Sequence, residues 1–385
     1  MAEKAFSPPW AGLTADSRKV KPGFLFAALP GVKDDGRQFI PAAIQAGATH
    51  ILAPSGTQLP PEAAGVTLIQ DGNPRRCLAL EAARFYGKQP PTIVAVTGAN
   101  GKTSVVWFVQ QLWAALGIKA ACLGTVGLHG GGFDRDGNLT TPDPVTLHAI
   151  LKEVAEAGVD HLALEASSHG LDQERLAAVR IAAGGFTNLT RDHLDYHGSM
   201  DAYFRAKSRL FEERIQEGGT AILNADTPQC ASLSAIAARR RLRVLTYGAA
   251  GKDLVLRGIT PVSGGQRLQL EILGRAHDLV LPLIGEVQVF NALCALGLVI
   301  GTGSDPALAT EALSRLKSVR GRMEKVLTLP GGATVYVDYA HTPDGLETLL
   351  KGLRAHTQGH LVVVFGCGGD RDRGKRPVMG RIACT

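Results

Sequence analysis

The hydrophobic pattern is clearest in the middle of the chain, where short apolar runs alternate with stretches of helical period. Runs at Ile93–Val96, Ala120–Gly124 and His161–Glu165 predict buried strands, and the spacing over residues 103–116 and 147–154 predicts helices between them. Further strands are expected at Gly185–Leu189, Ala221–Asn224 and Val244–Tyr247, and a further helix at 289–300. This alternation is typical of an α/β fold with a doubly wound, largely parallel sheet.

Residues 252–285 follow a different pattern, with a period of two. Large apolar residues recur at every second position in three short runs, Leu254/Leu256, Leu268/Leu270/Ile272 and Leu279/Leu281/Leu283, and Gly264-Gly265 lies between the first two runs. Such alternation predicts antiparallel strands with one solvated face, and paired glycines suit a hairpin turn. We therefore expect a small antiparallel sheet, inserted near the end of the central domain.

The two ends of the chain carry α/β patterns of their own. Residues 1–88 combine short apolar runs with a helix through Leu78–Tyr86, and the two prolines that follow indicate a linker. From about residue 319 we expect a strand at Thr334–Asp338, a helix after Pro343, a strand at Leu361–Phe365 and the beginning of a helix. These elements are too few to bury both faces of a sheet, so the third domain is expected to be incomplete. The predicted domains are 1–88, 89–318 and 319–385.

Composition narrows the class of protein. The 385 residues include 46 glycines, 45% hydrophobic residues and only 5% aromatic residues, which suits an α/β protein rich in Ala, Val and Leu. The formal charge of +6 is scattered, which favours a site for anionic small molecules over nucleic acid. The six cysteines form no CxxC pair, the N-terminus has no apolar signal core, and no run approaches the roughly 18 apolar residues of a membrane span. We expect a cytoplasmic protein that neither binds nucleic acid nor inserts into a membrane.

The first candidate site is the string IVAVTGANGKTS, which begins at Ile93. An apolar strand leads into a glycine turn and then into a helix. Gly98 and Gly101 allow the backbone to turn its N–H groups toward an anion, and the helix N-terminus adds partial positive charge. Lys102 would reach the terminal phosphates, and Thr103 would hold Mg²⁺. The spacing departs from the common GxxxxGK[ST] form, and the alternative is a glycine-rich turn with a solvated lysine.

A carboxylate at the end of another predicted strand supports a phosphate site. Glu165 ends the run that begins at His161, and open α/β sheets bind ligands at the carboxyl ends of their strands. Opposite Thr103 it would complete a Mg²⁺ site of oxygen ligands, although a Glu at a strand end can also cap a helix. The polar residues that follow suit an anionic substrate: Ser167, Ser168, His169, Gln173 and Arg175.

Two further segments carry candidate chemistry. In FTNLTRDHLDYHGSMDAYFRAKSRLF, His193 and His197 are four apart and could share a helical face as zinc ligands, but no Glu general base lies between them and no third soft ligand is evident. Lys207 falls on an amphipathic helix, where composition alone indicates a surface lysine. In FGCGGDRDRGKRP, Arg371 belongs either to a solvated loop or to a receptor for a carboxylate or phosphate.

The combined motifs resemble those of the Mur ligases. The resemblance runs from about residue 13 to residue 382 and rests on DSRKVKPGFLFAALPG, VTGANGKTS, TTPDP, EASSHGLDQER, FTNLTRDHLDYHGSMDAYFRAK, GRME, DYAHTPDGLE and FGCGGDRDRGKRPVMG. Within the family, the chain is most similar to the enzymes that add the third residue to UDP-N-acetylmuramoyl-L-alanyl-D-glutamate in peptidoglycan synthesis. The resemblance implies three domains: a small N-terminal α/β domain, a central P-loop ATPase-like domain and a C-terminal Rossmann-like domain.

The resemblance also implies roles for individual residues. The UDP-N-acetylmuramoyl dipeptide would contact Ser17, Thr140, Thr141, Ser167, Gln173 and Arg175, and the incoming diamino acid would contact Arg371. ATP would contact Gly98, Ala99, Asn100, Gly101, Lys102, Thr103, Ser104, Asn291, Arg322 and Asp338. The catalytic residues would be Lys102, Lys207, His193 and Glu165, and the Mg²⁺ ligands would be Thr103, Glu165, His193 and Lys207. Lys207 would be N6-carboxylysine, an anionic carbamate, which overturns the surface-lysine interpretation. Ala99 stands where the family usually has Thr.

The implied reaction is ATP-dependent amide formation through an acyl phosphate, by a monomeric enzyme that takes meso-diaminopimelate rather than L-lysine. The family's later DNPR-type motif, which selects this amino acid, does not occur in the sequence. A C-terminally truncated form that is inactive or only binds its ligands is therefore one alternative. A folylpolyglutamate- or cyanophycin-type ligase is another, although the DSR start and the DHLDYHG string argue against it.

Overall fold

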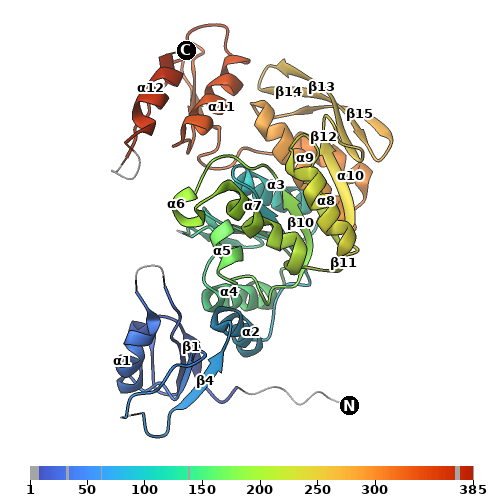
Figure 1. Ribbon diagram of the computed structural model, residues 1–385. Helices are drawn as coiled ribbons and strands as arrows, with labels where there is room; N and C mark the ends of the chain where they lie inside the picture. Colours follow the sequence, from blue (N-terminus) through green and yellow to red (C-terminus); the bar gives the residue numbers. More distant parts are fainter. Residues whose placement is uncertain (1–7, 32–33, 62, 138, 369–372, 385) are drawn as a thin grey trace. The chain divides into compact units, whose positions relative to one another are not determined.

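The computed structural model describes residues 8–31, 34–61, 63–137, 139–368 and 373–384. They form two compact units. Figure 1 shows the helices and strands of the chain, coloured from the N-terminus in blue to the C-terminus in red. The smaller unit comprises Met1–Pro91, Thr141–Asp160 and Ala166–Arg180, and the larger unit comprises Thr92–Thr140, His161–Glu165 and Ile181–Thr385. The smaller unit thus takes two segments from the range predicted as the central domain. The boundaries at residues 88 and 318 stay predictions.

The smaller unit is built on a parallel sheet of four strands in the order β1-β2-β3-β4. Leu25 and Leu52 belong to one buried cluster, whereas Phe26 and Ile51 belong to another, because successive side chains of a strand point to opposite faces. The strands are β1 (Gly12–Thr14), β2 (Phe24–Ala27), β3 (His50–Pro54) and β4 (Thr67–Asp71). The helices are η1 (Ser17–Lys19), η2 (Gly36–Phe39), α1 (Ile40–Gln45), α2 (Pro74–Tyr86), α4 (Pro144–Glu156) and α5 (Ser168–Asp172).

The larger unit contains an 11-stranded sheet whose six central strands are parallel, in the order β12-β11-β10-β5-β9-β6. β9 and β10 flank β5 on opposite sides, which confirms the doubly wound sheet and creates a switch point at the carboxyl end of β5. These strands are β5 (Thr92–Thr97), β6 (Ala120–Gly124), β9 (His161–Glu165), β10 (Ile181–Phe186), β11 (Ile215–Asn224) and β12 (Arg243–Gly248).

Both edges of this sheet are antiparallel. β13 (Leu254–Val262), β14 (Gly265–Ile272) and β15 (Arg275–Leu281) pair as the period of two predicts, but β13 also pairs in parallel with β12. The expectation of a separate inserted sheet is therefore wrong, because the backbone edge of β12 accepts β13 directly. At the other edge β6 continues into β7 (Gly127–Gly130) and β8 (Phe133–Arg135), a glycine-rich hairpin that the apolar pattern did not indicate.

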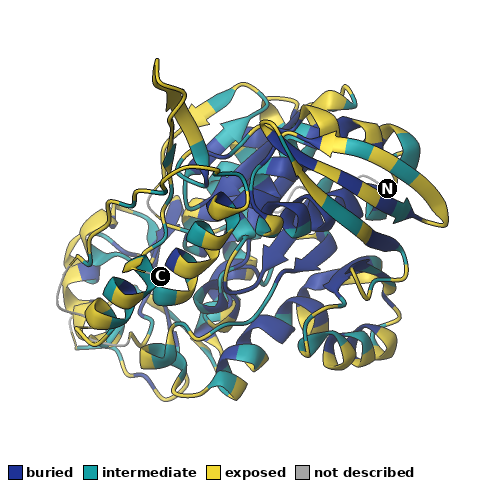
Figure 2. Cartoon of the chain, turned by 90° about the horizontal axis from the view of Figure 1, so that it is seen from above, coloured by how far each residue is buried: buried dark blue, intermediate teal, exposed yellow. Residues whose placement is uncertain are grey.

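Helices of the larger unit bury their apolar faces on this sheet. The two main ones are α3 (Lys102–Ala115) and α9 (Glu286–Gly301), which pack against each other and share one buried cluster with the strands. Figure 2 shows this buried material in dark blue. Other helices of this unit are α6 (Leu194–His197), α7 (Met200–Arg209), η3 (Leu210–Arg214), α8 (Gln229–Arg239), α10 (Pro306–Ala312) and η4 (Leu313–Arg315). Every helix in the described ranges is too short or too polar to cross a membrane.

The sequence explains where several helices begin. A capping side chain accepts a backbone N–H in the first turn, and proline follows at the first helical position, where its missing N–H costs nothing. This pair begins α2, α4, α10 and the later helix α11 (Pro343–Arg354), as Asn73-Pro74, Asp143-Pro144, Asp305-Pro306 and Thr342-Pro343.

The C-terminal part departs from the expectation at one strand. β16 (Glu324–Thr328) pairs with β17 (Thr334–Val337), α11 follows Pro343, and α12 (Lys375–Cys384) is the helix expected near the end. Leu361–Phe365 is not a strand, since no neighbouring strand in the described part of the chain supplies its ladder. A second correction concerns β10, which ends at Phe186 rather than Leu189, because its last pair with β5 is Phe186 with Thr97.

Candidate functional site

Three neighbouring strands of the larger unit end at the candidate site. β5 leads into the glycine turn at Gly98, β9 ends on Glu165, and β10 is followed by Thr187. Since parallel strands present their carboxyl ends at one edge of a sheet, these three segments meet. A cavity of about 530 Å³ lies at this edge. Of the ten residues predicted to bind ATP, all except Gly98 line it, and Thr140, Glu165 and His193 line it too.

The glycine turn has the backbone that a phosphate loop requires. Gly98 and Gly101 have φ of +148° and +89°. A Cβ on Gly98 would lie 1.9 Å from Thr187 Oγ1, and one on Gly101 would lie 2.3 Å from Asn291 Oδ1. A side chain at either position would be strained by this backbone conformation and would have to displace its neighbour. After the turn, α3 begins at Lys102, so the first N–H groups of this helix have no acceptor within the helix.

Lys102 lies over the turn. Its ammonium group donates hydrogen bonds to the carbonyl oxygens of Gly98 and Ala99, at 2.9 and 2.8 Å. Burial lowers the pKa of Lys102, and the nearby carboxylates of Glu165 and Asp192 act in the opposite direction. Lys102 is half-buried and lines the cavity, which favours the phosphate-loop interpretation over a solvated lysine.

Glu165 is held by a set of hydroxyl and amide donors. Its Oε1 accepts hydrogen bonds from Thr103 Oγ1 at 3.0 Å and from the Thr125 backbone N–H at 2.8 Å. Thr125 Oγ1 lies 3.3 Å from Oε2 and 3.0 Å from Thr140 Oγ1. The side chain is 2% exposed, and it stands at a cavity wall rather than at a helix cap. Paired hydroxyl and carboxylate oxygens fit Mg²⁺, which prefers oxygen ligands.

His193 contributes to the same wall. It precedes α6 with a left-handed backbone (φ +51°), and its Nε2 lies 3.4 Å from Asp192 Oδ2. Within the described ranges, no three His, Cys, Asp or Glu side chains come together as a metal cluster. The zinc alternative for His193 and His197 therefore gains no third ligand.

Lys207 is buried, although composition alone indicated a surface lysine. The residue lies on α7 as predicted but is 1% exposed, so the surface-lysine interpretation is wrong. Its Nζ donates to the Gly98 carbonyl at 2.7 Å and lies 4.3 Å from the centre of the Tyr203 ring. Burial holds the pKa of Lys207 well below its ordinary value, and the charge of Lys102 lowers it further, against the effect of Asp192. The Gly98 carbonyl thus accepts hydrogen bonds from both Lys102 and Lys207.

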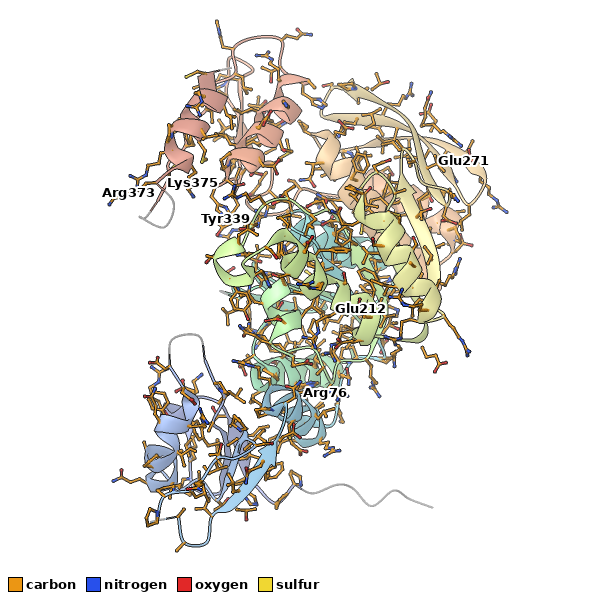
Figure 3. All side chains as sticks on the ribbon, in the orientation of Figure 1. Arg76, Glu212, Glu271, Tyr339, Arg373 and Lys375 are labelled. Atoms are coloured by element: carbon orange, nitrogen blue, oxygen red, sulfur yellow. The ribbon has the colours of Figure 1, made fainter. Side chains whose placement is uncertain are left out.

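The far side of the cavity comes from α9 and the segments around β16 and β17. Asn291 donates to Gln288 Oε1 at 3.1 Å. The Arg322 guanidinium lies 4.6 Å from the ring centre of Tyr339, which is labelled in Figure 3. Asp338 accepts the backbone N–H groups of Met323 and Ala340, each at 2.7 Å. These contacts fix the positions of the three predicted nucleotide residues at the cavity wall.

Most of the predicted dipeptide-binding residues lie in the smaller unit. Thr141 Oγ1 accepts the Ser167 N–H at 3.0 Å, and Arg175 donates to the Thr141 carbonyl at 2.5 Å. Gln173 Oε1 accepts two hydrogen bonds from the Arg175 guanidinium, at 3.2 and 2.7 Å. The structure therefore brings these four residues together. Ser17 lies apart from them in sequence, at the start of η1. Arg371 lies outside the described residues.

Sequence models of known protein families match three ranges of this chain. The Mur ligase middle domain matches residues 96–299, more than half of the chain. The chain belongs to the Mur ligase family. The family's N-terminal model, described as the catalytic domain, matches residues 10–86, and the glutamate ligase domain matches residues 321–385. The expected three-domain Mur ligase architecture is confirmed.

The chain is also similar to individual Mur ligases and related enzymes. A relative from Caulobacter vibrioides, named UDP-N-acetylmuramoyl-L-alanyl-D-glutamate–2,6-diaminopimelate ligase, is 50% identical over 98% of this chain and 78% of its own. A solved structure with the same enzyme name has a TM-score of 0.80 and 32% identity, over 98% of this chain and 76% of that one. Mycobacterium tuberculosis folylpolyglutamate synthase, complexed with ADP and AMPPCP, has a TM-score of 0.60 at 22% identity, over 73% and 70% of the two chains, and shares the fold. The matches run along nearly the whole of this chain and span 78% and 76% of the first two of these relatives.

Four side chains at the site of this Mur ligase were not predicted from its sequence. Thr125, Asn188, Thr190 and Asp192 also line the cavity. Thr125 follows the end of β6, and the other three follow the end of β10. Placing the end of β10 at Phe186 would have found them, because residues just beyond parallel strands face the ligand edge.

Proposed function

We propose that this Mur ligase joins 2,6-diaminopimelate to UDP-N-acetylmuramoyl-L-alanyl-D-glutamate with ATP, through an acyl phosphate. The observation that carries the proposal is one cavity lined by the phosphate turn, by the Thr103–Glu165 pair and by Asn291, Arg322 and Asp338. The names of relatives near 50% identity support the substrate class.

The phosphates of ATP would lie at the N-terminus of α3. The N–H groups of the first turn and the partial charge of the helix attract the anion, and Lys102 exchanges its carbonyl partners for the terminal phosphates. Arg322 and Asp338 enter the cavity beside Asn291, which suits the charge and hydroxyl groups of the nucleoside end. A preorganised positive site of this kind stabilises the charge on the transferred phosphoryl group.

Thr103, Glu165 and His193 would hold Mg²⁺, which supplies charge neutralisation at the phosphoryl oxygens. The chain prepares this site by keeping Glu165 buried and hydrogen-bonded to two threonines. We also propose that Lys207 reacts with CO₂ to form N6-carboxylysine, an additional anionic ligand. Its low pKa supports this step, since carbamate formation needs a neutral amine.

The acceptor is the D-glutamyl carboxylate of the dipeptide substrate. Its oxygen attacks the terminal phosphorus of ATP, and ADP leaves. The diamino acid nitrogen then attacks the acyl carbon, the amide forms, and phosphate leaves with loss of a proton. The site has to exclude water, because water hydrolyses an acyl phosphate. Thr140, Thr141, Ser167, Gln173, Arg175 and Ser17 are proposed to hold the UDP-muramoyl substrate, and Arg371 is proposed to contact the diamino acid.

The enzyme acts in the cytoplasm, where ATP is available, and as a monomer. It prefers meso-diaminopimelate to L-lysine. It has no nucleic-acid partner.

The test is a ligation assay with purified protein, ATP, Mg²⁺ and the UDP-muramoyl dipeptide. Mass spectrometry should find the amide product with meso-diaminopimelate and much less with L-lysine. Phosphate release without amide would limit the function to activation of the carboxylate, and failure to bind the dipeptide would reject the substrate assignment.

A further inference from the structure

Thr187 and Asn188, the two residues that follow β10, hold the phosphate turn through hydrogen bonds, and we call this pair the brace. The Thr187 hydroxyl donates to the Asn100 carbonyl at 2.6 Å. Asn188 accepts the Ala99 N–H with its carbonyl at 2.8 Å, and it accepts the Asn100 N–H with its side-chain oxygen at 2.9 Å. The turn therefore has hydrogen bonds to this brace at two successive residues.

This brace determines which backbone donors of the turn can face an anion. The N–H groups of Ala99 and Asn100 are directed at Asn188, so these two donors are already occupied. The N–H groups at the start of α3, from Gly101 to Ser104, remain for the phosphates. A displacement of the brace would rotate these donors, because the turn and the helix start share one continuous backbone.

Thr187 is itself fixed from the neighbouring strands. Asn224, at the end of β11, donates from its amide to the Thr187 carbonyl at 2.9 Å, and its side-chain oxygen accepts the Asp226 N–H at 3.0 Å. Tyr247 of β12 donates its hydroxyl to the Phe186 carbonyl at 3.1 Å. Thr187, Asn224 and Tyr247 are all buried. Side-chain hydrogen bonds thus run across three strands and end at the phosphate turn.

Close packing makes the Thr187 hydroxyl specific. A Cβ at Gly98 would lie 1.9 Å from this oxygen, so the turn passes against it with no spare space. A methyl group in place of the hydroxyl cannot donate, and carbon needs about 3.3 Å or more from a carbonyl oxygen. The Asn100 carbonyl would have to move away by a substantial fraction of an ångström.

We propose that Thr187 is a positioning residue for the nucleotide: its hydroxyl, held by Asn224 through the Thr187 carbonyl, orients the phosphate turn for ATP. The proposal rests on the proposed function only in that the cavity binds ATP. Thr187 does not line the cavity and acts through Asn100 and the helix start.

The test compares two substitutions at one position. Thr187→Val keeps the shape and removes the hydroxyl, and Thr187→Ser keeps the hydroxyl. Calorimetry with ATP and ADP in Mg²⁺, and KM for each substrate, should be measured together with circular dichroism. Thr328→Val, at an exposed position of β16, makes the same chemical change away from the site and serves as the control.

Thr187→Val should raise the Kd and KM for the nucleotide at least about fivefold, the scale of one buried hydrogen bond, with KM for the dipeptide within about twofold of wild type. Thr187→Ser and Thr328→Val should remain close to wild type. Asn224→Leu, which leaves the turn untouched, should give a smaller rise in the same direction. If Thr187→Val does not fold, the nucleotide affinity of Asn224→Leu tests the proposal instead.

Unchanged nucleotide affinity in folded Thr187→Val, or equal damage by Thr187→Ser, would overturn the proposal. An equal rise in KM for all substrates would also overturn it, since it would indicate a general structural role. Wild-type protein that binds no ATP would instead reject the proposed function.

Discussion

Two apolar runs that look alike in the sequence differ in the structure: one is a buried strand, and the other is an exposed segment that forms no strand. Ile93–Val96 (IVAV) and Leu361–Phe365 (LVVVF) are both short, rich in β-branched residues and expected to be buried strands. The first forms most of β5, between β9 and β10, and its four residues are 0% exposed. In the second, Val362 and Val364 are 82% and 95% exposed, and no strand is formed.

The difference teaches that an apolar run encodes a preference and that its neighbours decide the outcome. β5 receives hydrogen bonds along both edges, from β9 and β10, and helix α3 packs on the sheet. A strand without such partners leaves its backbone groups unpaired and its side chains in water. The candidate site also adjoins the buried run, because the turn after β5 is hydrogen-bonded to the residues that follow the neighbouring strand β10.

The largest expected contrast is in hydrogen exchange. Amides of β5, β9 and β10 should open with free energies near that of global unfolding, about 5–15 kcal/mol, whereas amides in Leu361–Phe365 should exchange with almost no protection. Exchange followed by mass spectrometry of peptides from both regions measures this directly. Equal protection in the two runs would break the comparison.

The second prediction concerns the chemistry at the end of β5. Lys102→Ala removes the charge that we propose to face the terminal phosphates, so ligation should fall at least about 10³-fold and ATP should bind more weakly. Product formation and calorimetry are the measurements. Lys252→Ala, at an exposed position before β13, is the matched control and should be active. Normal turnover in Lys102→Ala would remove the phosphate turn from the mechanism.

The third prediction extends the contrast between buried and exposed positions to histidine. His148 of α4 is 1% exposed, and burial lowers its pKa from 6.5 to about 4. Between these values the unfolded state binds more protons than the folded state, so stability should decrease as pH falls from 6.5 to 4, by about 3 kcal/mol from this residue. Urea denaturation should show that His148→Leu lacks this loss of stability, whereas His360→Leu, at an exposed site, retains it. Parallel profiles for wild type and His148→Leu would contradict the assignment.

The smallest effect is expected from one substitution made in both runs. Val94→Ala, at a fully buried position, should lower the free energy of unfolding by about 2 kcal/mol, from lost burial and an added cavity. Val364→Ala, at a side chain 95% exposed, should change it by less than about 0.5 kcal/mol. Guanidinium denaturation gives both values. Similar losses at the two positions would mean that Val364 is buried in solution.

Local patterns predicted much of the fold correctly. β6 and β9 occupy the predicted ranges, and the helices that contain Leu78, Leu147 and Val289 were expected. These elements have one apolar face or a fully apolar run, so their period is written in a few consecutive residues. The glycine hairpin of β7 and β8 was missed, because glycine carries little periodic signal.

At the site, the residues of the phosphate turn could be found from sequence because glycine, lysine and threonine must follow one another there. The backbone of the turn favours glycine at Gly98 and Gly101, and the residues from Ala99 to Ser104 line the cavity. The contribution of Lys207 could not be derived from its own helix, where its neighbours permit either a surface or a buried lysine. Its burial depends on the Gly98 carbonyl, which is 109 positions away in the sequence.

By itself the sequence determined the periodic strands and helices, the capped helix starts and the glycine turn, since each depends on neighbours within one or two turns of the chain. Tertiary structure alone decided which apolar run became a strand, that β13 joined the central sheet, and that Thr187 and Asn224 lie behind the phosphate turn. The physical reason is that strand pairing and burial depend on backbone partners from distant parts of the chain. These partners become neighbours only when the strands on both sides of β5 have paired with it.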